Sequence, residues 1–242
     1  IISTIKLFLV FEGDPLSEFS VLPDNIIIIP FISEKHSQFI NFFGGLYESR
    51  GYKIKFIQED GENKINIYSD YHFDSIKFSF KPFAIHLLLP KLQKDIDTLL
   101  WTDADLRCKK KFDSNALKKY LPENDKLMSY LGRKKPWYSE CGFLGFNLKH
   151  PDFHNYINRV IDIYVTGEIF SLEQWHDSWV WDYVRVEFEK NKNTKFKNIS
   201  GDGVNFDHPF VNCGLEEFFD HLKGVERKKI GKSFDSDFKL KK

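Results

Sequence analysis

The chain has no excess of charge of either sign. Its 35 Lys and Arg residues are balanced by 35 Asp and Glu residues, and the formal net charge is zero. A basic surface is what attracts phosphate backbones and anionic lipids, so this balance argues against general electrostatic binding of nucleic acid or of a membrane. Cysteine is also scarce. Cys108, Cys141 and Cys213 are isolated in sequence, which argues against a zinc ribbon or a disulfide framework and fits a reducing compartment.

Long apolar runs and linkers are missing as well. The apolar first segment, residues 1–11, is interrupted by Lys6, has neither a basic leader nor a small-residue cleavage site, and is too short to span a bilayer. We therefore expect a cytoplasmic protein without a membrane span. No repeat, low-complexity run or Pro/Gly/Ser-rich linker divides the 242 residues, so we expect one domain. Because the chain does not begin with Met, this domain is compatible with a longer parent protein.

Short apolar runs alternate with helical patterns, and this alternation predicts a layered α/β fold. We expect strands at residues 6–11, 25–31, 54–57, 65–68, 76–80, 98–101, 127–131 and 141–148. We expect helices at residues 33–51, 83–92, 152–165 and 172–190. Pro82 suits the first turn of the second helix, and Ser171 to Gln174 form an S-x-x-Q capping box at the start of the last.

The sharpest local feature is a buried strand that ends in Asp103-Ala104-Asp105. Ligands of α/β sheets bind at the carboxyl ends of strands. Two neighbouring carboxylates are costly unless a cation lies between them, and oxygen ligands select Mg²⁺ or Mn²⁺. Such an ion could neutralise a diphosphate leaving group. The alternative interpretation is a solvated loop after a strand, because a D-x-D tripeptide is common.

Four blocks follow one another along the chain, namely Pro82–Leu92 with Asp95–Asp105, Tyr138–Gly145, Gln174–Ser178 and Asp220–Gly224. In this order they resemble the GT-A glycosyltransferases of the retaining families 8 and 6. The first block is similar to the helix, Leu-Pro pair and strand that lead into the D-x-D motif of family 8. Gln174-Trp175-His176-Asp177-Ser178 resembles the Q-W-H-D-E-S run of family 6, and the last block resembles the H-x-x-G-x-x-K block of family 8. The resemblance extends from about Lys81 to Gly224.

This resemblance implies a GT-A-type, Rossmann-like mixed sheet flanked by helices. Residues 1–105 would form the nucleotide-donor half, and residues 106–242 the acceptor half with a C-terminal metal and diphosphate loop. It implies a metal-dependent glycosyltransferase that moves a sugar from a nucleotide-diphosphate donor, expected to be a UDP-sugar, to a hydroxyl of a glycan or another acceptor, with retention. Mn²⁺ or Mg²⁺ would be held by Asp103, Asp105 and His221. A lone histidine is more often a surface or core residue, and Asp207-His208-Pro209 is a nearby decoy for the same role.

The resemblance also implies roles for other residues. Contacts to the donor are expected from Phe11, Lys81, Asp103, Asp105, Lys223 and Gly224. Catalytic residues around the reacting carbon are expected to be Glu140, His176 and Asp177. The acceptor is expected to contact Trp137, Tyr138 and Trp175, although Trp137 and Tyr138 could equally be ordinary rim aromatics. Trp175, Trp179 and Tyr183 recur at i, i+4 and i+8, a spacing that favours core positions for Trp179 and Tyr183.

The sequence departs from these families in ways that keep alternatives open. Ser178 stands where family 6 has a glutamate proposed as nucleophile, and a serine there is a poor candidate to form a glycosyl-enzyme. Asp177 could therefore orient donor hydroxyls, stabilise oxocarbenium-like charge or act as a base in an inverting mechanism. The late block lacks the family 8 lysine, for which Lys223, Arg227 and Lys228 could substitute. A sugar-nucleotide pyrophosphorylase is a second possibility, and a non-catalytic carbohydrate- or nucleotide-binding protein on a degenerate transferase fold is a third.

Overall fold

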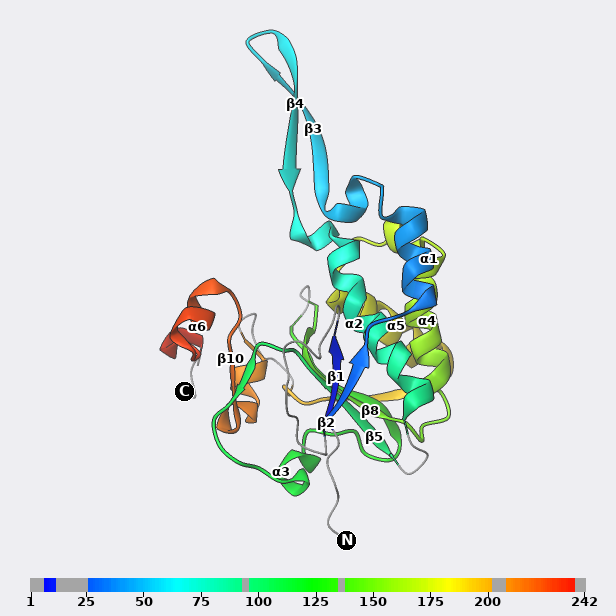
Figure 1. Ribbon diagram of the computed structural model, residues 1–242, viewed down its shortest axis with the longest axis vertical. Coiled ribbons are helices and arrows are strands. Elements are labelled where there is room, and N and C mark those ends of the chain that lie inside the picture. The colour runs from blue at the N-terminus through cyan, green and yellow to red at the C-terminus, as the bar shows by residue number, and fades with distance from the viewer. Residues whose placement is uncertain (1–6, 12–25, 93–95, 135–137, 202–207, 238–242) are drawn as a thin grey trace. The chain divides into compact units, whose positions relative to one another are not determined.

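The computed structural model describes residues 7–11, 26–92, 96–134, 138–201 and 208–237 (Figure 1). The chain divides into two compact units, each built from two stretches of sequence. Unit 1 comprises Ile1–Leu92 and Ile157–Val184, and unit 2 comprises Gln93–Tyr156 and Arg185–Lys242. The expected halves, which meet at residue 105, and the single domain stay predictions.

In its described residues, unit 1 contains two small sheets and all or part of four α-helices. Its elements are β1 (Leu7–Phe11), β2 (Ile26–Pro30), α1 (Glu34–Phe43), β3 (Tyr52–Glu59), β4 (Glu62–Ser69), α2 (Ser75–Leu88), and the adjoining parts of α4 (Phe153–Val165) and α5 (Asp177–Lys192). Strands β1 and β2 are parallel, and β3 and β4 form an antiparallel hairpin. Within the described residues, the strands expected at 6–11, 25–31, 54–57 and 65–68 and the first expected helix are confirmed, although that helix stops at Phe43. A 3-10 turn over Glu48–Arg50 follows it and ends at Gly51.

Helix α2 corrects two expectations. The strand expected at residues 76–80 is wrong, because these residues belong to the helix. Asp74 caps it, since its carboxylate accepts a hydrogen bond of 3.0 Å from the backbone N–H of Lys77. Pro82 lies inside the helix and not in its first turn. A proline usually ends a helix, but here the buried side chains continue from Ile76 on one side of Pro82 to Phe83 on the other.

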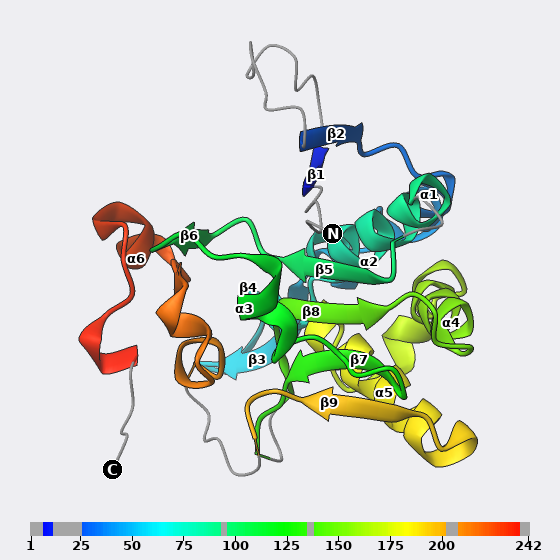
Figure 2. The ribbon, with the colours of Figure 1, turned by 90° about the horizontal axis from the view of Figure 1, so that it is seen from below.

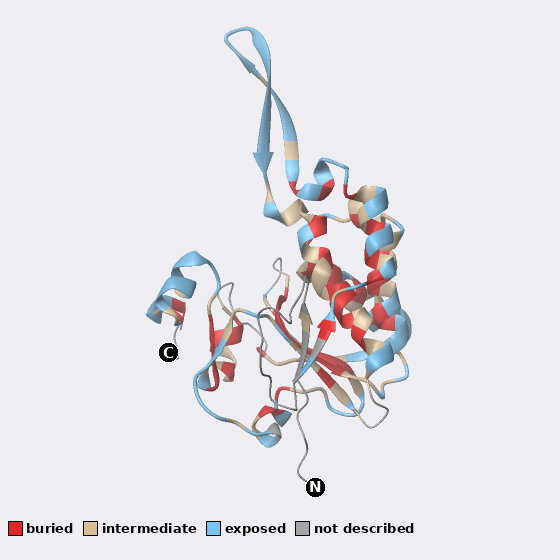
Figure 3. Ribbon diagram, viewed as in Figure 1, coloured by how far each residue is buried: buried red, intermediate tan, exposed pale blue. Residues whose placement is uncertain are grey.

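Three aromatic side chains form the centre of unit 1. Phe39 of α1, Phe83 of α2 and Tyr164 of α4 are fully buried. The ring centre of Phe39 lies 5.5 Å from that of Tyr164 and 6.2 Å from that of Phe83. Figure 3 shows buried residues along all three helices. The helical periodicity of the sequence therefore marks the faces that pack together.

The hairpin of β3 and β4 is exposed over almost its whole length (Figures 1 and 3). Its strands pair from Tyr52 opposite Ser69 to Glu59 opposite Glu62. Asp60 and Gly61 form the two-residue loop, both with positive φ, as a type I′ turn requires. Because side chains alternate between the faces of a strand, one face of the hairpin is apolar and solvent-exposed. It consists of Tyr52, Ile54, Phe56, Ile65 and Ile67.

Unit 2 is built around a four-stranded mixed sheet in the order β5-β8-β7-β9, which Figure 2 shows side by side. The strands are β5 (Thr98–Thr102), β7 (Lys126–Leu131), β8 (Glu140–Asn147) and β9 (Lys195–Asn198). Pairing is antiparallel except between β7 and β9, which are parallel. The strands expected at residues 98–101, 127–131 and 141–148 are confirmed.

Helices pack against this sheet. Tyr156 of α4 contacts Phe196 of β9 with ring centres 5.6 Å apart, and the guanidinium of Arg185 in α5 lies 4.5 Å from the ring centre of Tyr130 in β7. The expected fold class, an α/β arrangement with a mixed sheet flanked by helices, is therefore confirmed.

The start of α5 corrects another expectation. The capping box at Ser171 is wrong, because residues 168–171 form a 3-10 turn and the helix begins at Asp177. His176 provides the cap instead, since its Nδ1 accepts a hydrogen bond of 3.2 Å from the backbone N–H of Trp179. The sequence pattern favoured Ser171 because serine is a common capping residue and histidine is not.

A second small sheet completes unit 2. Strand β6 (Leu106–Cys108) pairs antiparallel with β10 (Phe219–His221), and the short helices are α3 (Ser114–Lys118) and α6 (Val225–Ile230). Its core cluster consists of Leu117, Tyr120, Leu131, Phe143, Phe210, Val211, Leu215, Phe218 and Phe219. In the described part of the whole chain, no helix combines the length and the apolar character needed to cross a bilayer.

Candidate functional site

Backbone pairing brings three distant segments of unit 2 to one place. Asp103 follows β5, and its N–H donates to the carbonyl of Gly142 in β8 at 3.1 Å. Asp105 precedes β6, whose Leu106 lies opposite His221 of β10. The N–H of Leu222 then donates to the carbonyl of Asp105 at 2.8 Å. The D-x-D turn therefore lies between a strand that carries Gly142 and a strand that carries His221.

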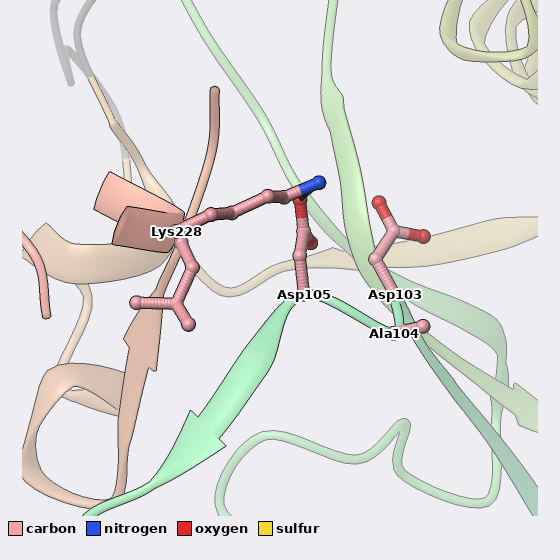
Figure 4. Close-up of a pocket in the computed structure, with 5 residues that line it drawn as sticks. Asp103, Ala104, Asp105 and Lys228 are labelled. Carbon is pink, nitrogen blue, oxygen red and sulfur yellow. Dashed lines mark ion pairs between the residues drawn. The ribbon is translucent and has the colours of Figure 1, made fainter. Parts of the chain in front are cut away.

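Asp103, Asp105 and His221 form a candidate metal centre. One possible ligand atom of each lies within 4.8 Å of the others. The Nε2 of His221 is 3.4 Å from Oδ1 of Asp105, and the indole N–H of Trp101 donates to Oδ1 of Asp103 at 2.9 Å. Beside the two aspartates lies a pocket of about 460 Å³, lined by Asp103, Ala104, Asp105, Leu222 and Lys228 (Figure 4).

Gly142 leaves the space that this arrangement needs. A Cβ atom at this position would lie 3.2 Å from Cε1 and 3.6 Å from Nε2 of His221, and 3.8 Å from Oδ2 of Asp103. A side chain at residue 142 would therefore crowd the ring of His221, whereas it would only touch Asp103.

The charges of the centre are strongly coupled. Burial alone would lower the pKa of His221, but the carboxylates of Asp105 and Glu140 outweigh it and raise this pKa to about 9. In turn the neighbouring His221 lowers the pKa of Asp105 against the effect of its burial, and Lys228 contributes to this shift. The ammonium of Lys228 lies 3.6 Å from Oδ2 of Asp105. Figure 4 shows the two side chains next to each other. His221 and Lys228 thus place positive charge beside this carboxylate.

Glu140, the first residue of β8, lies on the other side of the His221 ring. Its Oε1 is 3.0 Å from Nδ1 of His221 and 3.5 Å from Nδ1 of His208. Burial opposes ionisation, but the neighbouring His208 and His221 hold the pKa of Glu140 well below its ordinary value. The sequence predicted Glu140 as a catalytic residue at the reacting carbon, which stays a prediction, and did not indicate the histidines that it faces.

The donor set fits a divalent cation. Carboxylate oxygens suit Mg²⁺ and Mn²⁺, and a neutral imidazole suits Mn²⁺. In the part of the chain that the structure describes, Oδ1 of Asp105 is buried and makes no hydrogen bond, although it lies near His221. A buried polar atom without a hydrogen bond is costly, and a metal ion between Asp103, Asp105 and His221 would satisfy it.

A second cluster of expected site residues lies in unit 1. The ammonium of Lys81, in α2, is 2.8 Å from Oδ2 of Asp177, the first residue of α5, and both side chains are largely buried. The other carboxylate oxygen of Asp177 accepts a hydrogen bond of 2.9 Å from the backbone N–H of Ser178. The structure thus brings Lys81 and Asp177 together as a buried ion pair, and their roles toward a donor stay predictions.

His176 and Trp175 have the surroundings of packed residues. The Nε2 of His176 contacts the side-chain oxygen of Gln174 at 2.7 Å, and its other ring nitrogen caps α5. The indole N–H of Trp175 donates to the carbonyl of Leu172 at 3.1 Å, and its ring meets that of Phe73 edge to face. Trp175 is only 7% exposed. The catalytic and acceptor roles expected of the two residues stay predictions.

The remaining candidates are scattered. Lys223 lies 4.0 Å from Oε1 of Glu140, and Gly224 is exposed with φ of 82°. The carbonyl of Tyr138 accepts a hydrogen bond of 3.1 Å from Arg133. Phe11 ends β1 opposite Pro30. Trp137 lies outside the described residues.

Sequence reasoning missed several residues that surround the candidate metal centre. His208 was set aside as a decoy, yet its ring faces Glu140 and His221. Gly142 and Trp101 received no role. For Trp101 a signal existed, because side chains two residues apart on a strand share one face, and Asp103 is two residues on. Arg227, considered for the diphosphate, is instead paired with Asp237.

We compared the chain with known proteins. No protein family model matches it, and no curated protein matches it in sequence. Among solved structures it is similar to a crystal structure of mouse xyloside xylosyltransferase 1 in the apo form. The two are 12% identical with a TM-score of 0.39, and the match covers 84% of this chain and 72% of that chain.

Proposed function

We propose that this protein is a metal-dependent glycosyltransferase of the GT-A type, which moves a sugar from a nucleotide-diphosphate donor to a hydroxyl acceptor. The observation that carries the proposal is the convergence of Asp103, Asp105 and His221 beside a pocket in unit 2. We expect a UDP-sugar as donor.

Asp103, Asp105 and His221 would hold Mn²⁺ or Mg²⁺. When bound, this ion would offset the negative charge that develops on a diphosphate leaving group. The chain's own residues prepare the pocket for such a group. Trp101 fixes the carboxylate of Asp103 by a hydrogen bond, and Lys228 brings an ammonium to the wall of the pocket, where phosphate oxygens need a cation.

The ion pair of Lys81 and Asp177 belongs to the same proposal. Lys81 would contact the donor, and Asp177 would face the carbon at which transfer takes place, with retention of configuration. The ion pair allows Asp177 to be buried, because a buried carboxylate is costly unless a cation accompanies it. Asp177 rather than Ser178 takes this position, since a serine is a weak nucleophile without an adjacent base.

The test is a thermal-shift screen of UDP-, GDP- and CMP-sugars with and without Mn²⁺, followed by assays of sugar hydrolysis and transfer. A ligand that binds only the folded protein raises its apparent stability, by about 2.7 kcal/mol at a hundredfold excess over Kd. We expect a UDP-sugar to stabilise the protein only with Mn²⁺, and Asp105→Asn to abolish both the stabilisation and the turnover. Asp125→Asn is the matched control, because Asp125 is exposed in the same unit and contacts only Lys195 among the ion pairs that the structure describes.

A flat response of the wild-type protein to every nucleotide sugar would contradict the proposal, as would full transfer activity in the presence of a chelator. Binding of UDP with Mn²⁺, without hydrolysis or transfer of any sugar tested, would favour the non-catalytic binding protein.

A further inference from the structure

The two oxygens of Glu140 face different partners. Its Oε2 accepts a hydrogen bond of 3.4 Å from the backbone N–H of Phe210 and lies 3.4 Å from the guanidinium of Arg133. Its Oε1 lies 3.0 Å from Nδ1 of His221 and 3.5 Å from Nδ1 of His208. One oxygen is therefore anchored to the protein frame, and the other is presented to two imidazole rings.

The ring of His221 lies between two carboxylates. Its Nδ1 faces Glu140, and its Nε2 lies 3.4 Å from Oδ1 of Asp105. The ring is also held from the side, since its centre is 5.2 Å from the ring centre of Phe210 and 5.3 Å from that of His208. A carboxylate that faces one nitrogen of a metal-binding imidazole keeps the proton there and leaves the other nitrogen for the metal.

We propose that Glu140 is a positioning residue that fixes the orientation and the tautomer of His221, so that Nε2 is presented to a cation held with Asp103 and Asp105. This inference rests on the proposed function. It assigns Glu140 a role different from the one expected at the reacting carbon. Glu140 is 4% exposed and is not among the residues that line the pocket beside the aspartates, so it acts through His221.

Glu140 and His221 could instead belong to a second metal site. Glu140, His208 and His221 also have possible ligand atoms within 4.8 Å of one another, which is a donor set that Zn²⁺ accepts. Arg133 argues against a metal ion there, because its side chain is only 9% exposed and its guanidinium already pairs with Glu140. The pocket beside Asp103 and Asp105 is lined by neither Glu140 nor His208. The distances therefore favour a carboxylate that serves His221.

The test measures Mn²⁺ affinity by electron paramagnetic resonance of the free ion, without any donor or acceptor. Glu140→Gln removes the charge and keeps the shape, and Glu140→Leu removes both. We expect Mn²⁺ to bind about tenfold more weakly to the Gln variant, and more weakly still to the Leu variant. The matched control is Glu217→Gln, because Glu217 is exposed in the same unit and pairs with Lys110. Equal Mn²⁺ affinity of the wild type and folded Glu140→Gln would overturn the inference and leave the proposed function standing.

A second measurement uses only the wild-type protein. Nitrogen-15 NMR of the histidine rings, with Mg²⁺ bound, should show His221 protonated at Nδ1 and unprotonated at Nε2. The opposite tautomer would overturn the inference. So would a second bound metal ion per chain that His208→Gln removes, because that ion would occupy the place of the Nδ1 proton. If wild-type protein bound no divalent cation, both the inference and the proposed function would fail.

Discussion

Gly142 matters because of the side chain that it lacks. It lies in β8, which also carries Glu140, and its carbonyl accepts the N–H of Asp103. The space beside its Cα belongs to the rings and carboxylates of the candidate metal centre. A residue that is neither ligand nor acid can thus decide whether the ligands meet.

We predict that Gly142→Ala weakens Mn²⁺ binding about tenfold, because ligand positions have to hold within about 0.5 Å. The added Cβ would sit 3.2 Å from Cε1 of His221, which is tight enough to displace the ring. Gly45→Ala is the control, since a Cβ at Gly45 would meet no heavy atom within 4 Å. Titration with Mn²⁺ checks the prediction, and unfolding in urea shows whether the fold is retained. Unchanged affinity in the folded variant would show that the ring tolerates the methyl group.

Residues that carry chemistry were predictable where they stand close together in sequence. Asp103 and Asp105 could be recognised because two acids follow one short apolar run. His208 could not be recognised in the same way. Its contact with Glu140 joins residues far apart in the chain. The sequence around His208 has no feature that distinguishes it from an ordinary loop. A local sequence pattern is therefore enough to predict the two aspartates, whereas the residues that surround them depend on contacts formed only in the folded protein.

At the scale of elements, helices α1 and α2 are joined by a buried histidine. His36 of α1 contacts the hydroxyl of Ser79 in α2 through Nε2 at 2.9 Å, and its ring lies near those of Phe80 and Phe83. Burial lowers the pKa of His36 to about 4. The neutral ring is therefore the form that the folded protein accommodates.

This histidine predicts a loss of stability in mild acid. The unfolded chain takes up a proton near pH 6.5, but the folded chain does so only near pH 4, so protonation favours unfolding between these values. We expect His36 to remove about 2 kcal/mol from the free energy of unfolding between about pH 7.5 and about pH 5. Urea unfolding of the wild type and of His36→Gln at the two pH values checks this, because the difference between the proteins isolates His36. His154→Gln, an exposed histidine, should behave like the wild type. The same pH dependence in His36→Gln would assign the effect to other groups.

Elements were predictable where local signals agree, and not where they compete. Strands β5, β7 and β8 follow from apolar runs bounded by polar residues. Helix α2 was divided in the prediction because Pro82 signals a helix start, whereas the Asp74 cap and the buried face extend the helix across it. The start of α5 was misplaced for a related reason, since a histidine performs the capping that the pattern assigned to Ser171.

At the scale of the whole molecule, the sequence did not reveal the two interleaved units. Besides the boundary after Leu92, the boundaries fall within α4 and α5, where neither composition nor turn residues change. Composition detects linkers, but a helix that continues from one unit into the next leaves no such mark. The order of the motifs along the chain could therefore be taken from the sequence, whereas the unit to which each motif belongs could not be predicted from it.

The exposed hairpin of unit 1 predicts a position that tolerates insertion. We expect a short flexible peptide placed between Asp60 and Gly61 to change the free energy of unfolding by less than about 1 kcal/mol, because lengthening an open loop costs little. The same peptide between Gly167 and Glu168 should destabilise the protein by more. A Cβ at Gly167 would lie 2.6 Å from the ring of Phe43, so this turn is closely packed. Urea unfolding of the two insertion variants decides the matter, and equal losses would contradict the prediction.

The turn of this hairpin can therefore serve as an attachment site for labels and tags. Both of its loop residues are exposed, and the strands that support it place their side chains almost wholly in solvent. A dye, a spin label or an immobilisation tag attached there would leave the packing of Phe39, Phe83 and Tyr164 untouched. Sugar donors and metal ions could then be offered to protein fixed on a surface by a part of the chain that carries none of the candidate ligands.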